Sequence, residues 1–509
     1  MALAVTHDHW KKLLPPSFEW LEGVKITGIS NLDTMPDGTH GVVFVKTDSS
    51  DKDRFTIDAP LLDNAQRTKL LQVSTSLGWR AGGGCLHVQA ERNNFTLVPL
   101  SSVPALMRQV ARQAGLDLAK GVRDLRIDSL VLYGPSEGFS LDILEGFING
   151  LYSQVGFKGQ RKSEQKWPHQ ITLVGTDVSA KGLMDLIEYS KAQIITRFLQ
   201  DAPPNYLTPK KFADIATDIA QEFGLKHRVL GRKHMQDLNM GMFLSVAEGS
   251  VEEPQLICIE IPGVDQTKTV SLVGKGLTFD AGGISLKGAV GMEEMKYDMS
   301  GGAAVLGVAR YFSVIKPPVN VVCLIGATEN LPSGSAVKPS DVVKAFNGKT
   351  VEIQNTDAEG RLVLGDCLAY AIQEYKPTLV ADIATLTGAV LMALGCVGGA
   401  IFGSDQATAA TALKAAELSG EPFWQLPLWP ELEKEVKGDT ADLKNIAKPN
   451  VKAGTIMGAW FLKEFVGSTP WIHFDIAGTA WNCQALGYPS SGSGAFGLRT
   501  LVQLCKMYS

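Results

Sequence analysis

The sequence lacks the features of a disulfide-stabilised protein or a nucleic-acid-binding protein. Its seven cysteines are odd in number, form no C-x-x-C pair and lie mostly in apolar runs, which favours buried free thiols in a reducing compartment. A net charge of −5 gives no electrostatic reason to expect nucleic acid as the main partner. The eight histidines show no metal-ligand spacing.

The sequence also lacks an apolar run that is long enough to span a membrane. The best candidate, residues 387–402, is shorter than the ~20 residues that a span requires and is interrupted by glycines. We expect this run to form a buried helix that leads into a buried strand. Residues 1–14 carry charges and lack the apolar core of a signal peptide, so we expect a cytoplasmic protein.

A chain of 509 residues is too long for one ordinary hydrophobic core, so we expect several domains. Residues 1–175 have the pattern of a small α/β domain. Residues 176–204 indicate a linker helix that ends at Pro203 and Pro204, because paired prolines cannot continue a helix. From 205 to 509 apolar strands alternate with helices, which is typical of a mostly parallel mixed sheet flanked by helices. The predicted fold class is therefore α/β.

The periodicity of the apolar residues places the individual elements. In the first domain we expect strands at 41–45 and 129–133 and helices at 105–120 and 141–155. A long helix is expected at 180–200. In the second domain the expected strands are 255–261, 269–273, 319–325, 350–354, 378–383 and 471–476, and the expected helices are 210–222, 301–314, 362–374 and 456–466.

Charged residues concentrate in two segments of the second domain. The segment 355–361 carries two carboxylates and a guanidinium, spaced by two residues, and the glycine-rich segment 274–302 carries further acids and lysines. Together these segments contribute Lys275, Asp280, Lys287, Asp298, Asp357, Glu359 and Arg361. They offer oxygen and amine groups without histidine or cysteine, a donor set that suits Mg, Mn or Zn.

The predicted elements place these groups at the ends of strands. Lys275 directly follows the strand expected at 269–273, and Asp357 and Glu359 follow the strand expected at 350–354. Asp298 precedes a predicted helix in an N-cap-like position. Because ligands in open α/β sheets bind outside the carboxyl ends of the strands, we expect these side chains to converge.

Four converging carboxylates would repel one another strongly, and two divalent cations would remove that penalty. A lysine can join such a centre only as the neutral amine, whereas Lys287 and Arg361 would stay positive and face the charge of a tetrahedral intermediate. Each group alone has a simpler interpretation, such as a helix cap, a solvated charge or an Arg361–Glu359 ion pair. The spacing by itself leaves both interpretations open.

Six separated motifs give the sequence a close resemblance to a known family. They are PPNYLTP (203–209), VGKGLTFDAGGIS (273–285), EMKYDM (294–299), NTDAEGRLVL (355–364), DIATLTGA (382–389) and HFDIAG (473–478). In these motifs the chain resembles the leucyl aminopeptidase (cytosol aminopeptidase) family of two-metal exopeptidases. The resemblance is strong from about residue 195 to the end and weak before it.

The resemblance implies a set of metal ligands. One divalent metal, Zn or Mn and alternatively Mg, would be held by Asp280, Asp357 and Glu359, with the carbonyl of Asp357. The other would be held by Lys275, Asp280, Asp298 and Glu359, so Asp280 and Glu359 would bridge. A metal-bridging hydroxide would attack the N-terminal peptide bond, Lys287 would polarise the scissile carbonyl, and Arg361 would hold a bicarbonate ion that accepts the proton.

The resemblance also implies the substrate and the assembly. Backbone groups of Leu386 and Gly388 would align the peptide, and Met295, Asn355, Thr385 and Ala477 would line the pocket for a leucine or another apolar N-terminal residue. The expected assembly is a homohexamer without a membrane partner, and the first domain would serve interaction or assembly.

Two departures from the family pattern and two competing functions remain to be weighed. Ala281 replaces a common serine beside Asp280, so a supporting hydrogen bond would be missing, and Met457 and Gly458 replace Thr and Ala, which would alter packing behind the site. A non-enzymatic, DNA-binding role is disfavoured by the complete ligand set and the acidic net charge. A two-metal phosphoesterase is disfavoured because the resemblance extends far beyond the ligands.

Overall fold

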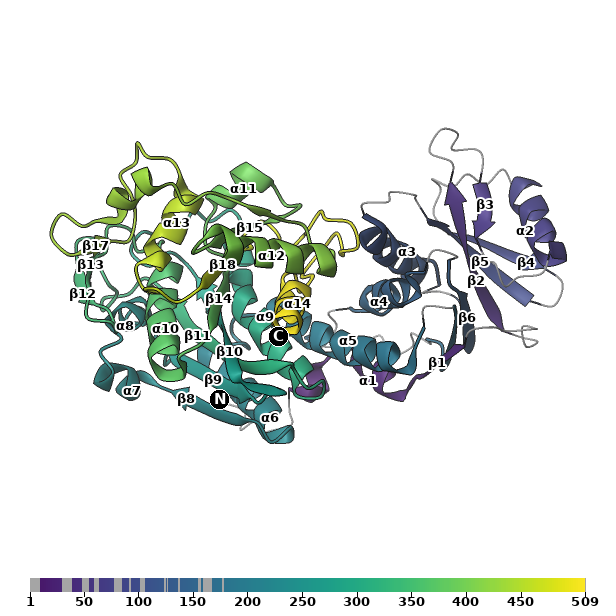
Figure 1. The fold of residues 1–509 in the computed structure, drawn as a ribbon, viewed down its shortest axis with the longest axis horizontal. Helices are drawn as coiled ribbons and strands as arrows, with labels where there is room; N and C mark the ends of the chain where they lie inside the picture. Colours follow the sequence, from purple (N-terminus) through teal and green to yellow (C-terminus); the bar gives the residue numbers. More distant parts are fainter. Residues whose placement is uncertain are drawn as a thin grey trace. The chain divides into compact units, whose positions relative to one another are not determined.

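The computed structural model describes residues 10–29, 39–47, 55–58, 64–76, 85–90, 93–100, 106–122, 125, 127–135, 138–153, 157–158, 167–175 and 178–508. Residues 1–9, 105 and 154–155, which belong to segments interpreted above, lie outside the described residues. The chain divides into two compact units, of which one comprises Lys11–Ile194 with Leu486–Pro489 and the other Met1–Trp10, Ile195–Ala485 and Ser490–Ser509 (Figure 1). The long helix α5 (Ala180–Asp201) passes from the first unit into the second.

The N-terminal unit is built on a mixed sheet with the strand order β1-β7-β6-β2-β5-β4, to which β3 adds by pairing with β2. Neighbours from β1 to β5 in this order are parallel, and β3 and β4 pair antiparallel with β2 and β5. The strands are β1 (Lys25–Ile29), β2 (His40–Thr47), β3 (Phe55–Asp58), β4 (Leu86–Ala90), β5 (Asn93–Leu100), β6 (Ser129–Tyr133) and β7 (Gln170–Val174). The helices are η1 (Lys11–Leu13), α1 (Pro16–Gly23), α2 (Asn64–Ser76), α3 (Met107–Val122) and α4 (Ser140–Gly150).

Alternating side chains of β2 build the two cores of this unit. Val42 and Phe44 point into a core that α1, α3 and α4 complete, while Val43 and Val45 point into a core that includes Leu70 of α2. Successive strand residues face opposite sides of a sheet, so a continuous apolar run requires helices on both sides. The apolar run in β2 therefore predicts the layered arrangement that is observed.

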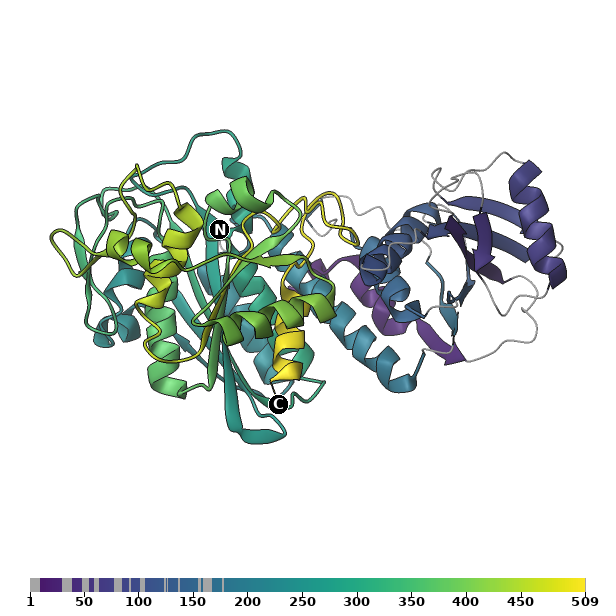
Figure 2. The same cartoon turned by 45° about the horizontal axis from the view of Figure 1, so that its top comes forward.

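The C-terminal unit contains the larger sheet, with eight strands among residues 178–508 in the order β16-β15-β18-β14-β10-β11-β9-β8 (Figures 1 and 2). The central strands β18, β14, β10 and β11 are mutually parallel, and β8, β9 and β15 introduce antiparallel pairs. The strands are β8 (Lys226–Leu230), β9 (Gln255–Ile261), β10 (Asp265–Asp280), β11 (Val319–Asn330), β14 (Leu379–Ala384), β15 (Gly399–Gly403), β16 (Phe423–Gln425) and β18 (Trp471–Asp475). The helices are α6 (Pro209–Glu222), α7 (Arg232–Asp237), α8 (Gly241–Ala247), η3 (Met292–Met299), α9 (Ser300–Phe312), α10 (Gly360–Tyr375), α11 (Ala389–Leu394), α12 (Gln406–Ser419), η4 (Pro430–Val436), α13 (Gly454–Lys463) and α14 (Leu498–Met507).

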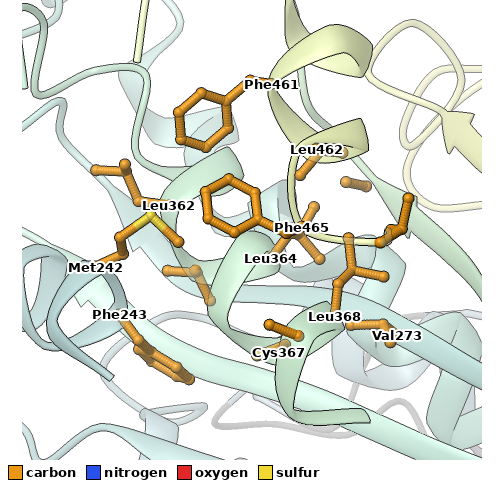
Figure 3. Packing of buried hydrophobic residues seen from close by; sticks show 14 of the residues in the cluster. Met242, Phe243, Val273, Leu362, Leu364, Cys367, Leu368, Phe461, Leu462 and Phe465 are labelled. Carbon is orange, nitrogen blue, oxygen red and sulfur yellow. The ribbon is translucent and has the colours of Figure 1, made fainter. Parts of the chain in front are cut away.

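Helices cover both faces of β10. Val273 and Leu277 pack into a core with Met242 of α8, Leu362 of α10 and Phe461 of α13 (Figure 3). On the other face, a Cβ on Gly274 would lie 2.6 Å from the Cα of Gly302, so α9 lies against the strand there. The predicted α/β class with a mostly parallel mixed sheet flanked by helices is confirmed.

The strand expected at 350–354 is shorter than predicted and belongs to another sheet. β13 (Thr350–Glu352) pairs antiparallel with β12 (Val342–Lys344) and parallel with β17 (Leu443–Lys444), in a separate three-stranded sheet of the C-terminal unit. Asp357 and Glu359 therefore follow a strand, as predicted, but this strand lies outside the eight-stranded sheet. The parallel partner of β13 is β17, which lies some 90 residues downstream in the sequence.

The run at 387–402 is predicted correctly only in its second half. β15 is buried, but α11 is a single short helix whose Met392 has 91% of its surface exposed. The expectation of a buried helix is wrong, because only Val390 of the six-residue helix is fully buried while Leu391 and Met392 are exposed. Among the helices in the described part of the chain, none is both long and apolar enough to cross a bilayer.

Candidate metal centre

Three segments of the C-terminal unit bring the predicted charged residues together. Lys275 lies inside β10 and Asp280 ends that strand, so the strand runs past the position where the sequence predicted its end. Asp298 lies near the end of η3, and its Oδ1 accepts a hydrogen bond from Thr385 Oγ1 at 2.7 Å. Met299 occupies the N-cap of α9, so the N-cap-like position predicted for Asp298 is wrong.

The third segment is the loop that enters α10. Asn355 Oδ1 accepts a hydrogen bond from the backbone N–H of Asp357 at 2.8 Å, which fixes a local turn. Glu359 occupies the N-cap of α10, which begins at Gly360 and not at residue 362, so Arg361 lies in its first turn. Two carboxylates therefore reach the centre from one loop only because the backbone turns between them.

Asp280, Asp357 and Glu359 form the tightest acidic group in the described part of the chain. Each offers a carboxylate oxygen, and these oxygens lie within 4.8 Å of one another. Asp298 joins the group through Lys275, whose Nζ lies 2.8 Å from Asp298 Oδ2 and 2.9 Å from Glu359 Oε1. Nearly all of this group is buried, with Asp357 the most accessible of the four acids.

Two ammonium groups compensate these carboxylates in the structure. Lys275 Nζ also donates to the carbonyl oxygen of Thr385 at 2.9 Å. Lys287 Nζ lies 2.7 Å from Asp280 Oδ2 and contacts Asp357 Oδ1. Positive charge is thus held at two positions, each between carboxylates from different segments.

The electrostatics of the centre favour added positive charge. Burial raises the pKa of Asp298, Glu359 and Asp357, and the charge of Asp280 raises it further. Burial alone would lower the pKa of Lys275, but its neighbouring carboxylates outweigh burial and raise it. Acids and a lysine whose pKa values are all raised mark a site in which several anions share too few cations.

A carboxylate oxygen without a hydrogen-bond partner is a separate indication that these residues fit a divalent metal. Glu359 Oε2 is buried and accepts no hydrogen bond from the described residues. An ionised oxygen without a partner is costly in a protein interior, and a metal ion would satisfy it. Asp280, Asp357, Glu359, Asp298 and the amine of Lys275 are therefore the residues that could hold metal here.

Two further residues support the centre and were not predicted from the sequence. Asn330 Nδ2 donates to Asp280 Oδ1 at 2.8 Å and to the carbonyl oxygen of Thr356 at 3.0 Å. Asn445 Nδ2 donates to the carbonyl oxygen of Asn355 at 2.6 Å. Asn330 ends β11 beside Asp280, so the pairing of two adjacent parallel strands is a signal that could have found it. The sequence around Asn445 carries no comparable signal.

Arg361 is buried beside the centre. Its Nη1 donates to the carbonyl oxygen of Asn445 at 2.9 Å, and its Nε has no partner among the described residues. Burial lowers the pKa of Arg361 to about 10, against the opposing effect of Glu359 and Asp475. The guanidinium thus retains donor capacity for an anion.

A cavity of about 320 Å³ opens beside Arg361. Its lining includes Asn355, Leu386 and Gly388 of the predicted substrate-binding residues, together with Asp357. The other lining residues are Ala358, Thr387, Ala389, Ile446, Ala447, Lys448, Pro449, Lys452, Ala453, Gly454 and Met457. The walls are largely apolar, and their charged groups are Asp357, Arg361 and two lysines.

Three predicted pocket residues lie outside this lining, although all are in the described part of the chain. Thr385 instead contacts Asp298 and Lys275, as given above. Met295 is half-buried in η3. Ala477 is half-buried, and its backbone N–H donates to Asp475 Oδ1 at 3.2 Å. The structure thus divides the predicted substrate-binding residues into two groups.

The two departures from the family pattern have local explanations. Asp280 Oδ1 accepts from the backbone N–H of Gly282 at 2.9 Å, so with Asn330 its carboxylate is held although Ala281 has no hydroxyl. A Cβ on Gly458 would lie 3.1 Å from Leu386 Cδ2, so glycine leaves room behind that residue. Met457 lines the cavity.

Comparisons with known proteins agree with this geometry. The profile of the cytosol aminopeptidase family, catalytic domain, matches residues 194–502. A "Probable cytosol aminopeptidase" of Desulforapulum autotrophicum is 42% identical over 416 residues, which cover 79% of this chain and 80% of that protein. A "Probable cytosol aminopeptidase" of Geobacter sulfurreducens is 42% identical over 428 residues, covering 82% and 85%.

A solved structure is also similar. The bottromycin maturation enzyme BotP, determined in complex with Mn, superposes with a TM-score of 0.80 at 28% sequence identity, covering 93% of this chain and 99% of that one. From the family profile, the relatives and the acidic centre together, the chain belongs to the cytosol aminopeptidase family, whose members are metal-dependent aminopeptidases.

Proposed function

We propose that this protein is a two-metal aminopeptidase that removes leucine or another apolar residue from the N-terminus of peptides. The observation that carries the proposal is the convergence of Asp280, Asp357 and Glu359 to within 4.8 Å, from a strand end and a distant loop. Buried acids are costly unless they are compensated, and Glu359 Oε2 has no partner among the described residues. A bound metal would compensate it.

Two divalent ions, Zn or Mn and alternatively Mg, are the proposed cofactors. Asp280, Asp357 and Glu359 would hold one ion, and Asp280, Asp298, Glu359 and the amine of Lys275 would hold the other. Bound there, such ions supply a Lewis acid and lower the pKa of water, so that a nucleophile is available near neutral pH. Lys275 serves as a ligand only after it loses its proton. The Mn bound by BotP supports this class of ion.

Lys287 and Arg361 have separate proposed roles. The Lys287 side chain is 22% exposed, so its ammonium can meet the oxygen of a scissile carbonyl and stabilise the charge that develops on it. Arg361 offers a rigid fork of donors that suits a planar anion, and a bicarbonate ion held there would accept the proton of the attacking water. Both roles need a positively charged residue that lies close to the metal ligands but does not itself bind metal.

The preference for an apolar first residue rests on the group formed by Met295, Thr385 and Ala477. Thr385 bonds to Asp298, Met295 precedes Asp298 in η3, and Ala477 lies beside Asp475; together with Asn355 they would line the pocket for the side chain of that first residue. The backbone groups of Leu386 and Gly388 would align the peptide along the neighbouring cavity, which they line. The free N-terminal amine of the peptide would bind beside the acidic residues of the centre, which would explain why cleavage begins at the N-terminus.

Asp357→Asn and Glu359→Gln test the proposal by hydrolysis of a leucine anilide and by metal content. We expect turnover to be lost and bound metal to fall, with an unchanged circular dichroism spectrum. Glu417→Gln is the matched control, because Glu417 pairs only with Lys414 on the surface of α12. Normal turnover in either site variant would reject the proposal.

The assembly and location of the protein are proposed from the family alone. A homohexamer in the cytoplasm, with the N-terminal unit serving assembly, is the state we propose. Light scattering during gel filtration should give six times the mass of one chain. A monomer of full activity would reject this part of the proposal.

A further inference from the structure

Two lysines at the cavity beside Arg361 have no assigned purpose. Lys448 and Lys452 line that cavity, and both are exposed. Within residues 178–508 neither makes an ion pair or a side-chain hydrogen bond. By contrast, Lys349 and Lys437 in the same unit both pair with Glu464.

The segment that carries the two lysines is anchored at both ends. On one side, the carbonyl of Asn445 accepts from Arg361, and on the other, Met457 of α13 is buried. Between them, the backbone N–H of Val451 donates to the carbonyl of Lys448 at 3.0 Å and closes a turn. Lys452 follows with φ 54°, a left-handed conformation that is uncommon for a residue with a side chain. Both lysines therefore project from a defined turn.

The charged groups that line the cavity are Asp357 and Arg361, which belong to the site, and Lys448 and Lys452. Asp357 is the acid in its lining and belongs to the metal centre, whereas Lys448 and Lys452 stand on the exposed 448–452 turn. Ala358, Leu386 and Ile446 give the walls between them an apolar surface. A cavity of about 320 Å³ is at the small end of ligand pockets.

A peptide substrate matches this charge distribution when its N-terminus lies at the acidic residues and its C-terminus points toward the lysines. Its free amine lies at the acids, and the residue after the scissile bond extends into the cavity. In a short peptide the next group along the chain is the terminal carboxylate. Two unpaired cations at a concave site raise the local potential for such an anion.

We propose that Lys448 and Lys452 bind the terminal carboxylate of short peptides, so that the enzyme favours dipeptides and tripeptides with a free C-terminus. This inference rests on the proposed aminopeptidase function and adds a substrate class to it. The lysines take no part in the bond cleavage itself, so they change the specificity and not the chemistry.

The test compares Leu-Ala with Leu-Ala-amide by kcat/KM. We expect Leu-Ala to be preferred by about tenfold, since one exposed ion pair contributes up to about fivefold and two lysines share the carboxylate. The double variant Lys448→Gln with Lys452→Gln should lose this preference and hydrolyse the amide at the wild-type rate. Higher ionic strength should reduce the wild-type preference in the same direction.

Lys376→Gln is the matched control. Lys376 is also exposed, has a left-handed φ of 46° and lies at the far end of α10 from Glu359. This variant should keep the wild-type preference. A loss of preference there would show that the effect is general surface charge, which would overturn the inference.

The remaining outcomes separate the inference from the proposed function. Equal hydrolysis of Leu-Ala and its amide would overturn the inference and leave the aminopeptidase function intact. A preference for Leu-Glu-amide over Leu-Gln-amide, without one for Leu-Ala over its amide, would assign the lysines to an acidic side chain and overturn the terminal-carboxylate assignment. Failure to cleave any of these peptides would reject the proposed function and, with it, the inference.

Discussion

Asn445 Nδ2 lies 2.6 Å from the carbonyl oxygen of Asn355, and this hydrogen bond ties the segment after β17 to the loop that carries two of the proposed metal ligands. Asn445 Oδ1 accepts from the backbone N–H of Gln354 at 2.9 Å, so one buried amide holds the loop from both sides. Its main-chain carbonyl accepts from Arg361. One residue thus supports the acid loop and the guanidinium.

Removing this amide should weaken metal binding without removing a ligand. We expect Asn445→Ala to lower kcat and metal affinity by about 10- to 100-fold, as is usual when a group that orients a ligand is lost. Chelator competition measures the affinity, and leucine anilide hydrolysis measures kcat. Asn320→Ala is the control, because Asn320 makes a similar clamp to Gly263 and Gln266. Equal losses in both variants would contradict a specific role for Asn445.

Gly360 gives Lys275 the space that it occupies. A Cβ at Gly360 would lie 2.6 Å from Lys275 Nζ and 2.7 Å from its Cε. Because this lysine is held by Asp298, Glu359 and the Thr385 carbonyl, it cannot move aside without losing these contacts. We expect Gly360→Ala to reduce metal affinity at the Lys275 side and to lower activity, although it removes no charged group.

Measurement of bound metal per chain checks this expectation. Gly334→Ala serves as the control, because a Cβ at Gly334 would meet nothing within 4 Å. Two metals bound at wild-type affinity in Gly360→Ala would show that Lys275 can be displaced without consequence. It would then not be a ligand.

Lys287 should matter for the reaction more than for metal binding. It contacts Asp280 and Asp357, and its side chain remains 22% exposed. We expect Lys287→Ala to lower kcat by about 10²- to 10³-fold with little change in metal content, as for the loss of one oxyanion-stabilising group. Lys210→Ala, on the surface of α6, should leave both unchanged. Loss of metal in Lys287→Ala would instead assign this lysine to holding the ligands.

Glycines explain why the sequence placed the end of β10 too early. The pattern Gly274-Lys275-Gly276 has the composition of a turn and interrupts an apolar run. In the structure both glycines are needed for close packing, with Gly274 against α9 and Gly276 against the carbonyl of Gly326 in β11. Local composition does not distinguish a turn from a crowded strand, because only the tertiary neighbours differ.

The charged residues of the centre were easier to predict than their supports. Lys275, Asp280, Asp357 and Glu359 belong to continuous motifs, and the structure brings them together. Asn445 acts through a loop about 90 residues away in sequence, and only the pairing of β13 with β17 places it there. Such a contact has no local pattern, because an asparagine in a turn has the same sequence signature whatever it binds.

The stability of the N-terminal unit should depend on His40. Its Nε2 lies 2.6 Å from Thr96 Oγ1, which also contacts His87 Nδ1 at 2.8 Å. Burial, followed by the charge of His87, lowers the pKa of His40 to about 4 from the usual 6.5. Because the folded pKa is depressed, the contribution of the neutral histidine to stability is complete above about pH 6.5 and is lost as the pH falls toward 4.

Unfolding of the wild type and of His40→Gln at pH 7.5 and near pH 5 tests this dependence. Between pH 7.5 and 5, His40 of the wild type takes up a proton in the unfolded chain and not in the folded chain. The free energy of unfolding should therefore fall more steeply for the wild type than for His40→Gln. The difference between the chains should amount to about 1–2 kcal/mol near pH 5. Loss of metal in acid acts on both chains alike and cancels in the comparison. Equal falls in the two chains would show that another group governs the acid sensitivity of this unit.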